Sequence, residues 1–240
     1  MSGRKPVLIE WRWVGVALAV LLAFDVTDIA FYAGHVLSLH GLAPGWLQTK
    51  LFDINREFGL VEDLEYGKSL VCAVAMGLCA RRRREIVFVA LAALHIWLAA
   101  DNAMALHERI GRVLGERLLG GATLGLERPA DLAQVVFFGT IGLMLIALFA
   151  VLLRRAPPPL ARTGVILLAA AASPGLFGVF VDAFRATPAA VPLSETALII
   201  LEDGGETVML SLATALCIGC LRHSRTWGRS RVAEPAGVRA

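Results

Sequence analysis

Long apolar segments alternate with short polar ones along most of this chain. A helix that crosses a membrane needs about 20 mainly apolar residues. Segments of about this length lie at residues 11–36, 62–80, 85–106, 132–153, 163–182 and 196–221. The second reaches this length only if Glu62 and Glu65 lie within the helix, and the fifth contains Pro174, where we expect a kink. The pattern predicts an all-α protein, specifically a six-helix transmembrane bundle.

Basic residues gather at one end of the predicted spans. The clusters are Arg4, Lys5 and Arg12; Arg81 to Arg84; Arg154, Arg155 and Arg162; and Arg222, Arg225, Arg229 and Arg231. Because cytoplasmic loops of membrane proteins are enriched in Lys and Arg, we expect both termini to be cytoplasmic. Residues 1–222 then form a single membrane domain, and residues 223–240 form a basic cytoplasmic tail that we predict to be disordered. The longer loops, 37–61 and 107–131, lie outside, and each contains a stretch expected to rest on the membrane surface.

The composition supports a membrane protein. Hydrophobic residues make up 57% and charged residues 18% of the chain, against about 45–50% and about 25% in soluble domains. The lipid bilayer is therefore the expected partner. A net charge of +3 does not indicate a nucleic-acid partner, because the basic residues sit in short loops beside apolar segments. All four cysteines fall inside apolar segments, so we expect no disulfide framework and interpret the C-x-x-C pair Cys217 and Cys220 as helix-packing residues.

Acidic residues recur at one depth of the predicted bundle. On four different spans a carboxylate lies 16 residues from a charged residue at the cytoplasmic end: Asp28 from Arg12, Glu65 from Arg81, Asp101 from Glu85, and Glu206 from Arg222. At 1.5 Å per residue this is about 24 Å from the inner face of a core about 30 Å thick. Charged side chains at such depth normally face the bundle interior or a water-filled cavity. We therefore predict a shared acidic layer that faces the outer side.

Further polar residues surround this layer. Asp25 lies deeper on the first span, Asp182 lies near the outer end of the fifth, and a shallower set consists of Glu62, Glu202, Asp203 and His107. So many carboxylates at one level require protons, cationic partners such as Lys68, or a metal. Asp, Glu and His together suit Zn²⁺, Mn²⁺ or Fe²⁺, whereas an all-oxygen subset suits Ca²⁺ or Mg²⁺.

The histidines differ in what their positions indicate. His107 is the strongest candidate ligand, because it lies at the mouth of the acidic layer, and His35 at the end of the first span is a second candidate. His95 lies in the middle of the third span, and we interpret it as a structural residue that is hydrogen-bonded inside the bundle.

Three stretches carry a resemblance to a known group of proteins. They are LFDINREFGLVEDLEY, LAADNAMALHERIG and LEDGGETVML. In this order they resemble uncharacterised bacterial inner-membrane proteins with the patterns L-F-x-[LI]-x-x-E, [LS]-x-D-E-x-x-x-[IL]-H-E and [LI]-E-[ED]-x-x-E, over residues 51–221. Positions that match the last two patterns are Asp101, His107, Glu108, Glu202, Asp203 and Glu206, whereas Asn102 stands where the pattern has an acid. The resemblance implies a multi-pass protein of the bacterial inner membrane and brings no established activity.

Three functions are compatible with these residues. The first is a metal-dependent hydrolase of a lipid or lipid-linked substrate, with Glu108 or Asp28 as general base. Its divalent metal, which could be Zn, Mn, Fe or Ca, would be held by Asp101, His107, Glu202 and Glu206. The second is a small proton- or cation-coupled transporter, which the intramembrane acids and the kink at Pro174 would fit. The cytoplasmic halves of the spans are apolar apart from Cys and Thr, which counts against transport. The third is a non-catalytic accessory protein whose acids bridge helices.

Overall fold

The structure, a computed structural model, describes residues 7–54, 59–117, 129–185 and 195–232. Within these ranges it is all-helical and has no strand. The helices are α1 (Trp11–Leu39), α2 (Leu60–Arg83), α3 (Ile86–Met104), α4 (Leu106–Arg117), α5 (Pro129–Arg155), α6 (Pro158–Ala172), α7 (Pro174–Arg185) and α8 (Glu195–Val232), with the short 3₁₀ turns η1 (Gly45–Gln48) and η2 (Lys50–Phe52). The predicted all-α fold class is confirmed.

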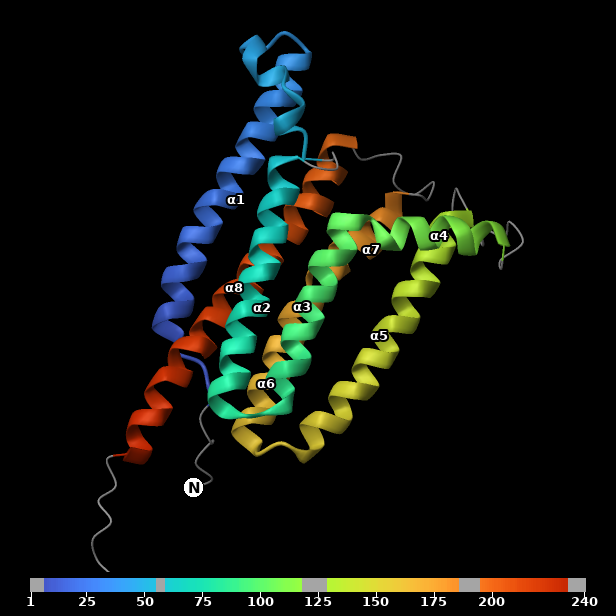
Figure 1. The fold of residues 1–240 in the computed structure, drawn as a ribbon. Coiled ribbons are helices and arrows are strands. Elements are labelled where there is room, and N and C mark those ends of the chain that lie inside the picture. Colours follow the sequence, from blue (N-terminus) through green and yellow to red (C-terminus); the bar gives the residue numbers. More distant parts are fainter. Residues whose placement is uncertain (1–6, 55–58, 118–128, 186–194, 233–240) are drawn as a thin grey trace, which may run out of the picture.

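Helix α8 occupies the centre of the packing. It contacts α1, α2, α6 and α7, and α2 also packs along α3. Figure 1 shows α1 beginning and α8 ending at the same end of the bundle, which we call the arginine end because Arg81–Arg84 also lies there. The opposite end, where α2 and α8 begin, carries many of the acids and is called the acidic end.

Five helical stretches in the described residues are long and apolar enough to cross a membrane. They are Trp11–Leu39, Ile86–Met104, Leu132–Arg155, Pro158–Gly178 and Glu195–Ser224. These correspond to five of the six predicted spans and indicate a multi-pass membrane protein. The remaining predicted span, residues 62–80, does form helix α2 but is not among these stretches. The count of six spans and the cytoplasmic termini stay predictions.

Two interruptions shape the acidic end. The predicted kink is confirmed, because α6 ends at Ala172 and α7 begins at Pro174, with the Ser173 hydroxyl donating to the Ala170 carbonyl over 2.8 Å. The second break was not predicted: Ala105 adopts a left-handed conformation with φ of 46° and ends α3. Helix α4 then turns across the end of the bundle (Figure 1).

The outward faces of the helices are apolar, and several inward faces are polar. Helix α1 exposes Val20 and Phe24 at 53% and 56% while Asp25 is fully buried. Helix α2 likewise exposes Val74 and buries Lys68. This arrangement is the reverse of a soluble amphipathic helix and is expected where lipid surrounds the bundle.

Helix α8 is longer than the last predicted span. It continues to Val232 through part of the segment predicted as a disordered tail. Arg82 Nη1 donates to Ser224 Oγ over 3.2 Å, so the first turn beyond residue 221 is held against the end of α2. Residues 233–240 lie outside the described ranges.

Candidate functional site

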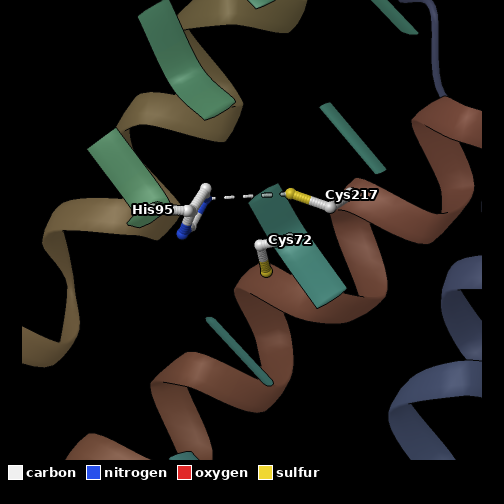
Figure 2. Close-up of side chains that lie close together, drawn as sticks. All are labelled: Cys72, His95 and Cys217. Carbon is white, nitrogen blue, oxygen red and sulfur yellow. Dashed lines mark hydrogen bonds between the residues drawn. The ribbon is translucent and has the colours of Figure 1, made fainter. Parts of the chain in front are cut away.

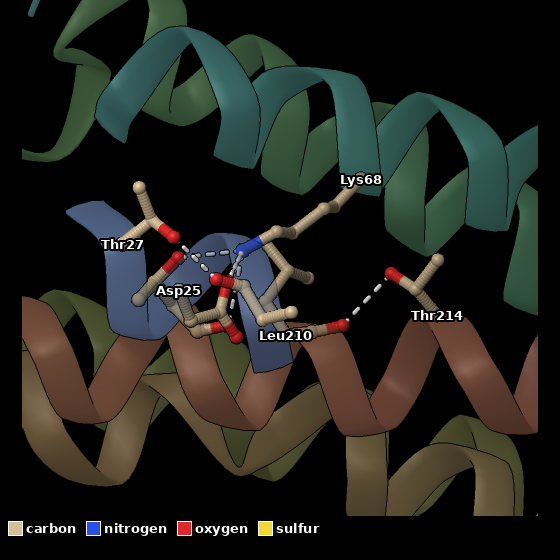
Figure 3. Close-up of polar contacts among 7 residues, drawn as sticks. Asp25, Thr27, Lys68, Leu210 and Thr214 are labelled. Atoms are coloured by element: carbon tan, nitrogen blue, oxygen red, sulfur yellow. Dashed lines mark hydrogen bonds and ion pairs between the residues drawn. The ribbon is translucent and has the colours of Figure 1, made fainter. Parts of the chain in front are cut away.

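A buried ion pair joins α1 to α2. Lys68 Nζ lies 2.6 Å from Asp25 Oδ1, and the exposed fractions of the two side chains are 6% and 0%. Figure 3 shows Lys68 reaching from α2 toward Asp25. Because the two charges are buried inside the bundle, their mutual attraction is only weakly screened, and removal of either one would leave the other buried and unpaired.

Helix α8 completes the coordination of the lysine. Lys68 Nζ donates to Thr207 Oγ1 over 2.6 Å and approaches the Thr207 carbonyl at 3.3 Å. The Thr207 side chain is also hydrogen-bonded to the Glu65 carboxyl group. Asp25, Lys68, Thr207 and Glu65 therefore form a continuous hydrogen-bonded chain across α1, α2 and α8, which we call the lysine–carboxylate network.

Acids outnumber cations in and around this network. Asp28, one turn from Asp25, is buried and within electrostatic range of both Asp25 and Lys68. Glu65 is likewise within electrostatic range of Lys68 and of Asp203. The single ammonium of Lys68 therefore faces the carboxyl groups of Asp25, Asp28 and Glu65. Ionisation of all three would leave two uncompensated negative charges, so protonation of part of the set is the simplest way to neutralise it.

Buried polar atoms without a hydrogen-bond partner mark the same region. Within the described part of the chain they include Asp25 Oδ2, Asp28 Oδ2 and Ser211 Oγ. Buried polar atoms in native proteins are usually satisfied, so such atoms call for an ordered water, an ion or a proton. The network thus has capacity to hold further small polar species.

The other predicted residues are distributed around the acidic end. Asp101 is buried near the end of α3, and the Tyr66 hydroxyl donates to the neighbouring Asn102 carbonyl at 3.5 Å. Glu206 turns its carboxylate toward α7, where it lies directly against Gly178. Glu202 on α8 is half-buried. The structure therefore gathers the network around Lys68, whereas Glu206 faces the α7 side of the bundle.

Some predicted positions remain partly undescribed. Among the acidic-layer residues, Glu62 is half-buried at the start of α2 and in electrostatic contact with Glu65. The side chains of His107, Glu108 and Asp182 lie outside the described residues, although their backbones belong to α4 and α7. The predicted metal set of Asp101, His107, Glu202 and Glu206 therefore stays a prediction.

His35 has a structural contact at the acidic end. Its Nδ1 lies 2.8 Å from the Leu47 carbonyl in η1, and the side chain is buried. The Ser38 hydroxyl donates to the Pro44 carbonyl over 3.0 Å, and Gln48 Nε2 donates to the Ser38 carbonyl over 2.9 Å. These bonds fold the segment after α1 back over the helix end.

A second polar cluster was not predicted. Cys72 on α2, His95 on α3 and Cys217 on α8 place one ligand atom each within 4.8 Å of one another, and all three side chains are buried (Figure 2). His95 Nε2 lies 3.9 Å from Cys217 Sγ, and Cys72 Sγ lies 3.3 Å from Thr214 Oγ1. We call this trio the thiol–imidazole cluster.

The sequence contains only a weak signal for the thiol–imidazole cluster. Cys217 belongs to the C-x-x-C pair that was interpreted as packing, and His95 was interpreted as structural. Cys72 and His95 are 23 residues apart and Cys217 is far along the chain, so their meeting depends on how three helices are rotated about their axes. No short-range spacing encodes that rotation.

The lysine–carboxylate network and the thiol–imidazole cluster lie along one interface. Helices α2 and α8 pack against each other, and both clusters draw residues from these two helices. Between and beyond them α2 and α8 have buried hydroxyl and thiol groups at Ser69, Cys79, Ser211, Thr214, Cys220 and Ser224. These groups are spread along the two helices from the acidic end to the arginine end, and the cysteines among them lie in the hydrophobic core cluster.

Residues 13–220 match the family model of a domain of unknown function, DUF8692. The chain belongs to the DUF8692 family. The matched range includes both clusters of this DUF8692 chain and agrees with the predicted membership of an uncharacterised family; the three sequence patterns and a bacterial origin stay predictions. No curated protein and no solved structure matches this DUF8692 chain.

Proposed function

We propose that this DUF8692 chain is an integral membrane protein that couples uptake and release of protons at the lysine–carboxylate network to transport of a small solute or cation. The observation that carries the proposal is the position of Lys68, whose ammonium is buried against Asp25 and Thr207 among several carboxyl groups. Intramembrane ionisable residues in such surroundings are typical of proton relays.

The position of Lys68 favours binding of a proton over binding of a metal ion in this network. The Lys68 ammonium already lies 2.6 Å from Asp25 Oδ1, so a divalent cation bound to Asp25 would lie close to a positive charge. Repulsion between these charges is strong in a weakly polar interior. A proton added to Glu65 or Asp28, by contrast, removes excess negative charge and leaves the ion pair intact.

Buried hydroxyl groups on α8 support movement through the bundle. A transporter needs polar groups that continue inward from the acids, and α8 supplies hydroxyls at Ser211 and Thr214, the latter in contact with Cys72 on α2. The Thr214 hydroxyl donates to the Leu210 carbonyl over 2.8 Å (Figure 3). The break between α6 and α7 at Pro174 lies beside α8, since both helices pack on α8.

Proton exchange by the network can be tested by infrared difference spectroscopy of the purified protein. A step between neutral and acidic pH should change the C=O stretching band of protonated carboxyl groups. The band change should shrink in Asp28→Asn and in Glu65→Gln, because each removes one of the two acids proposed to take up the proton. Asp63→Asn is the matched control, since Asp63 is an exposed acid on the same helix as Glu65.

Two results would contradict proton exchange at this site. One is a band change that is equal in the wild type, Asp28→Asn and Glu65→Gln. The other is a change lost only in Asp63→Asn, which would assign it to the exposed surface. Circular dichroism and size-exclusion chromatography check that each variant is folded before its spectrum is interpreted.

The metal-dependent hydrolase of a lipid or lipid-linked substrate stays a second prediction, with its site at the mouth of the acidic end. It rests on His107 and Glu108, whose side chains lie outside the described residues. Metal content that is lost in His107→Ala with Glu206→Ala, but kept in Asp25→Asn, would support it.

A further inference from the structure

Two thiols and an imidazole converge in the middle of the bundle from three different helices. Cys72, His95 and Cys217 are each no more than 1% exposed, and their ligand atoms lie within 4.8 Å of one another. We propose that these three residues bind a thiophilic metal ion, with Zn²⁺ the ion that fits best. The proposal is independent of the proton-coupled function, because it involves none of the residues of the lysine–carboxylate network.

The spacing of the donor atoms suits a small metal ion. With Zn–S bonds of about 2.3 Å and Zn–N bonds of about 2.0–2.1 Å, tetrahedral geometry separates sulfur from nitrogen by about 3.6 Å. His95 Nε2 and Cys217 Sγ are already 3.9 Å apart. Modest side-chain rotations therefore bring the donors into coordination distance, with no rearrangement of the helices.

Thr214 adds an oxygen beside the trio. Its Oγ1 lies 3.3 Å from Cys72 Sγ, and its hydroxyl proton is donated to the Leu210 carbonyl. Thr214 Oγ1 can thus accept a hydrogen bond from the Cys72 thiol, or face a bound ion once that thiol has lost its proton. His95 is held less completely: within the described residues its Nδ1 has no hydrogen-bond partner. A buried imidazole whose remaining contact is a long one to a thiol gains a stronger interaction by binding a metal.

Charge balance selects a divalent ion. Binding requires both thiols to be deprotonated, and the two protons they lose pass to the solvent. Two thiolates and a neutral imidazole then give a neutral complex with Zn²⁺. Neutrality matters because the surroundings are apolar, with Phe88 and Leu91 fully buried in the same core cluster.

A second thiol pair provides an internal control. Cys79 on α2 and Cys220 on α8 face each other in side-chain contact, as Cys72 and Cys217 do. Within the described residues, the metal-competent group consists of Cys72, His95 and Cys217 and does not include this second pair. Replacement of both control cysteines should therefore leave metal binding unchanged.

The test is metal binding by the full-length protein, purified in detergent with a reductant that does not bind metals. The protein is equilibrated with Zn²⁺ for elemental analysis and with Co²⁺ as a spectroscopic probe. We expect about one ion per chain, a thiolate-to-cobalt charge-transfer band, and release of two protons per Zn²⁺. His95→Gln should weaken binding by more than the roughly 10–100-fold that loss of an outer-shell partner costs.

The variants decide between a specific site and adventitious thiol binding. Cys72→Ser with Cys217→Ser should abolish the charge-transfer band, whereas Cys79→Ser with Cys220→Ser should retain it. The proposal is overturned if the wild type binds no stoichiometric metal. It is equally overturned if the Cys79 and Cys220 variant loses the metal while the Cys72 and Cys217 variant keeps it. A thermal melt with and without Zn²⁺ checks folding, and only the metal-competent forms should be stabilised.

Discussion

Removal of the Lys68 ammonium would leave Asp25 as a buried carboxylate without its cation. Lys68→Met should therefore reduce the free energy of unfolding by about 3–5 kcal/mol, the usual cost of breaking a buried pair. The double variant Asp25→Asn with Lys68→Met removes both charges and should recover most of that loss. Detergent-titrated unfolding measures both values. A double variant that is less stable than Lys68→Met would show that the pair is not the unit of stability.

At the residue scale the sequence predicted the burial of most acids of the layer but not their partners. The depth count singled out Asp28, Glu65, Asp101 and Glu206; the first three are buried, whereas Glu206 is half-buried. Glu65 lies one turn from Lys68 on the same helix, yet the 2.6 Å contact is made with Asp25 on another helix. Spacing along one helix says nothing about how a neighbouring helix is rotated, so this pairing could not be predicted from the sequence.

Contact between α7 and α8 depends on the second of the two adjacent glycines of LEDGGETVML, Gly205. A Cβ at Gly205 would overlap the ring of Phe177 on α7, whereas a Cβ at Gly204 would meet its nearest atom, Ile29 Cδ1, at 3.4 Å. Gly205→Ala should therefore destabilise the protein by about 1–3 kcal/mol through overpacking. Gly204→Ala should be neutral or stabilising by up to about 1 kcal/mol, since alanine favours the helix. Thermal melts of the two variants, side by side, provide the comparison.

Equal melting temperatures for the two glycine variants would contradict the α7–α8 packing.

At the element scale, most helices followed from the apolar pattern, and the break at Pro174 followed from the chemistry of proline. The end of α3 could not be predicted in this way, because Ala105 adopts a left-handed backbone conformation, which is uncommon for residues other than glycine. The predicted third span consequently extends to residue 106, whereas α3 ends at Met104.

The molecule as a whole turns apolar side chains outward and gathers polar ones along the α2–α8 interface. Helix α2 does not qualify as a span by hydropathy because it has many charged residues, and two of these, Glu65 and Lys68, are buried against other helices. The sequence predicted a membrane bundle with an acidic layer. It did not predict the thiol–imidazole cluster, because that cluster exists only once three helices are packed together.

The central claim, that protons move with a solute or cation through this bundle, is tested most directly in proteoliposomes. Vesicles that contain the protein and a pH-sensitive dye are supplied in turn with amino acids, sugars, and monovalent and divalent cations. The account predicts that at least one class changes the internal pH in the wild type and in Asp63→Asn, and that Asp25→Asn abolishes the change. If no class moves protons, or if Asp25→Asn behaves as the wild type does, the claim is contradicted.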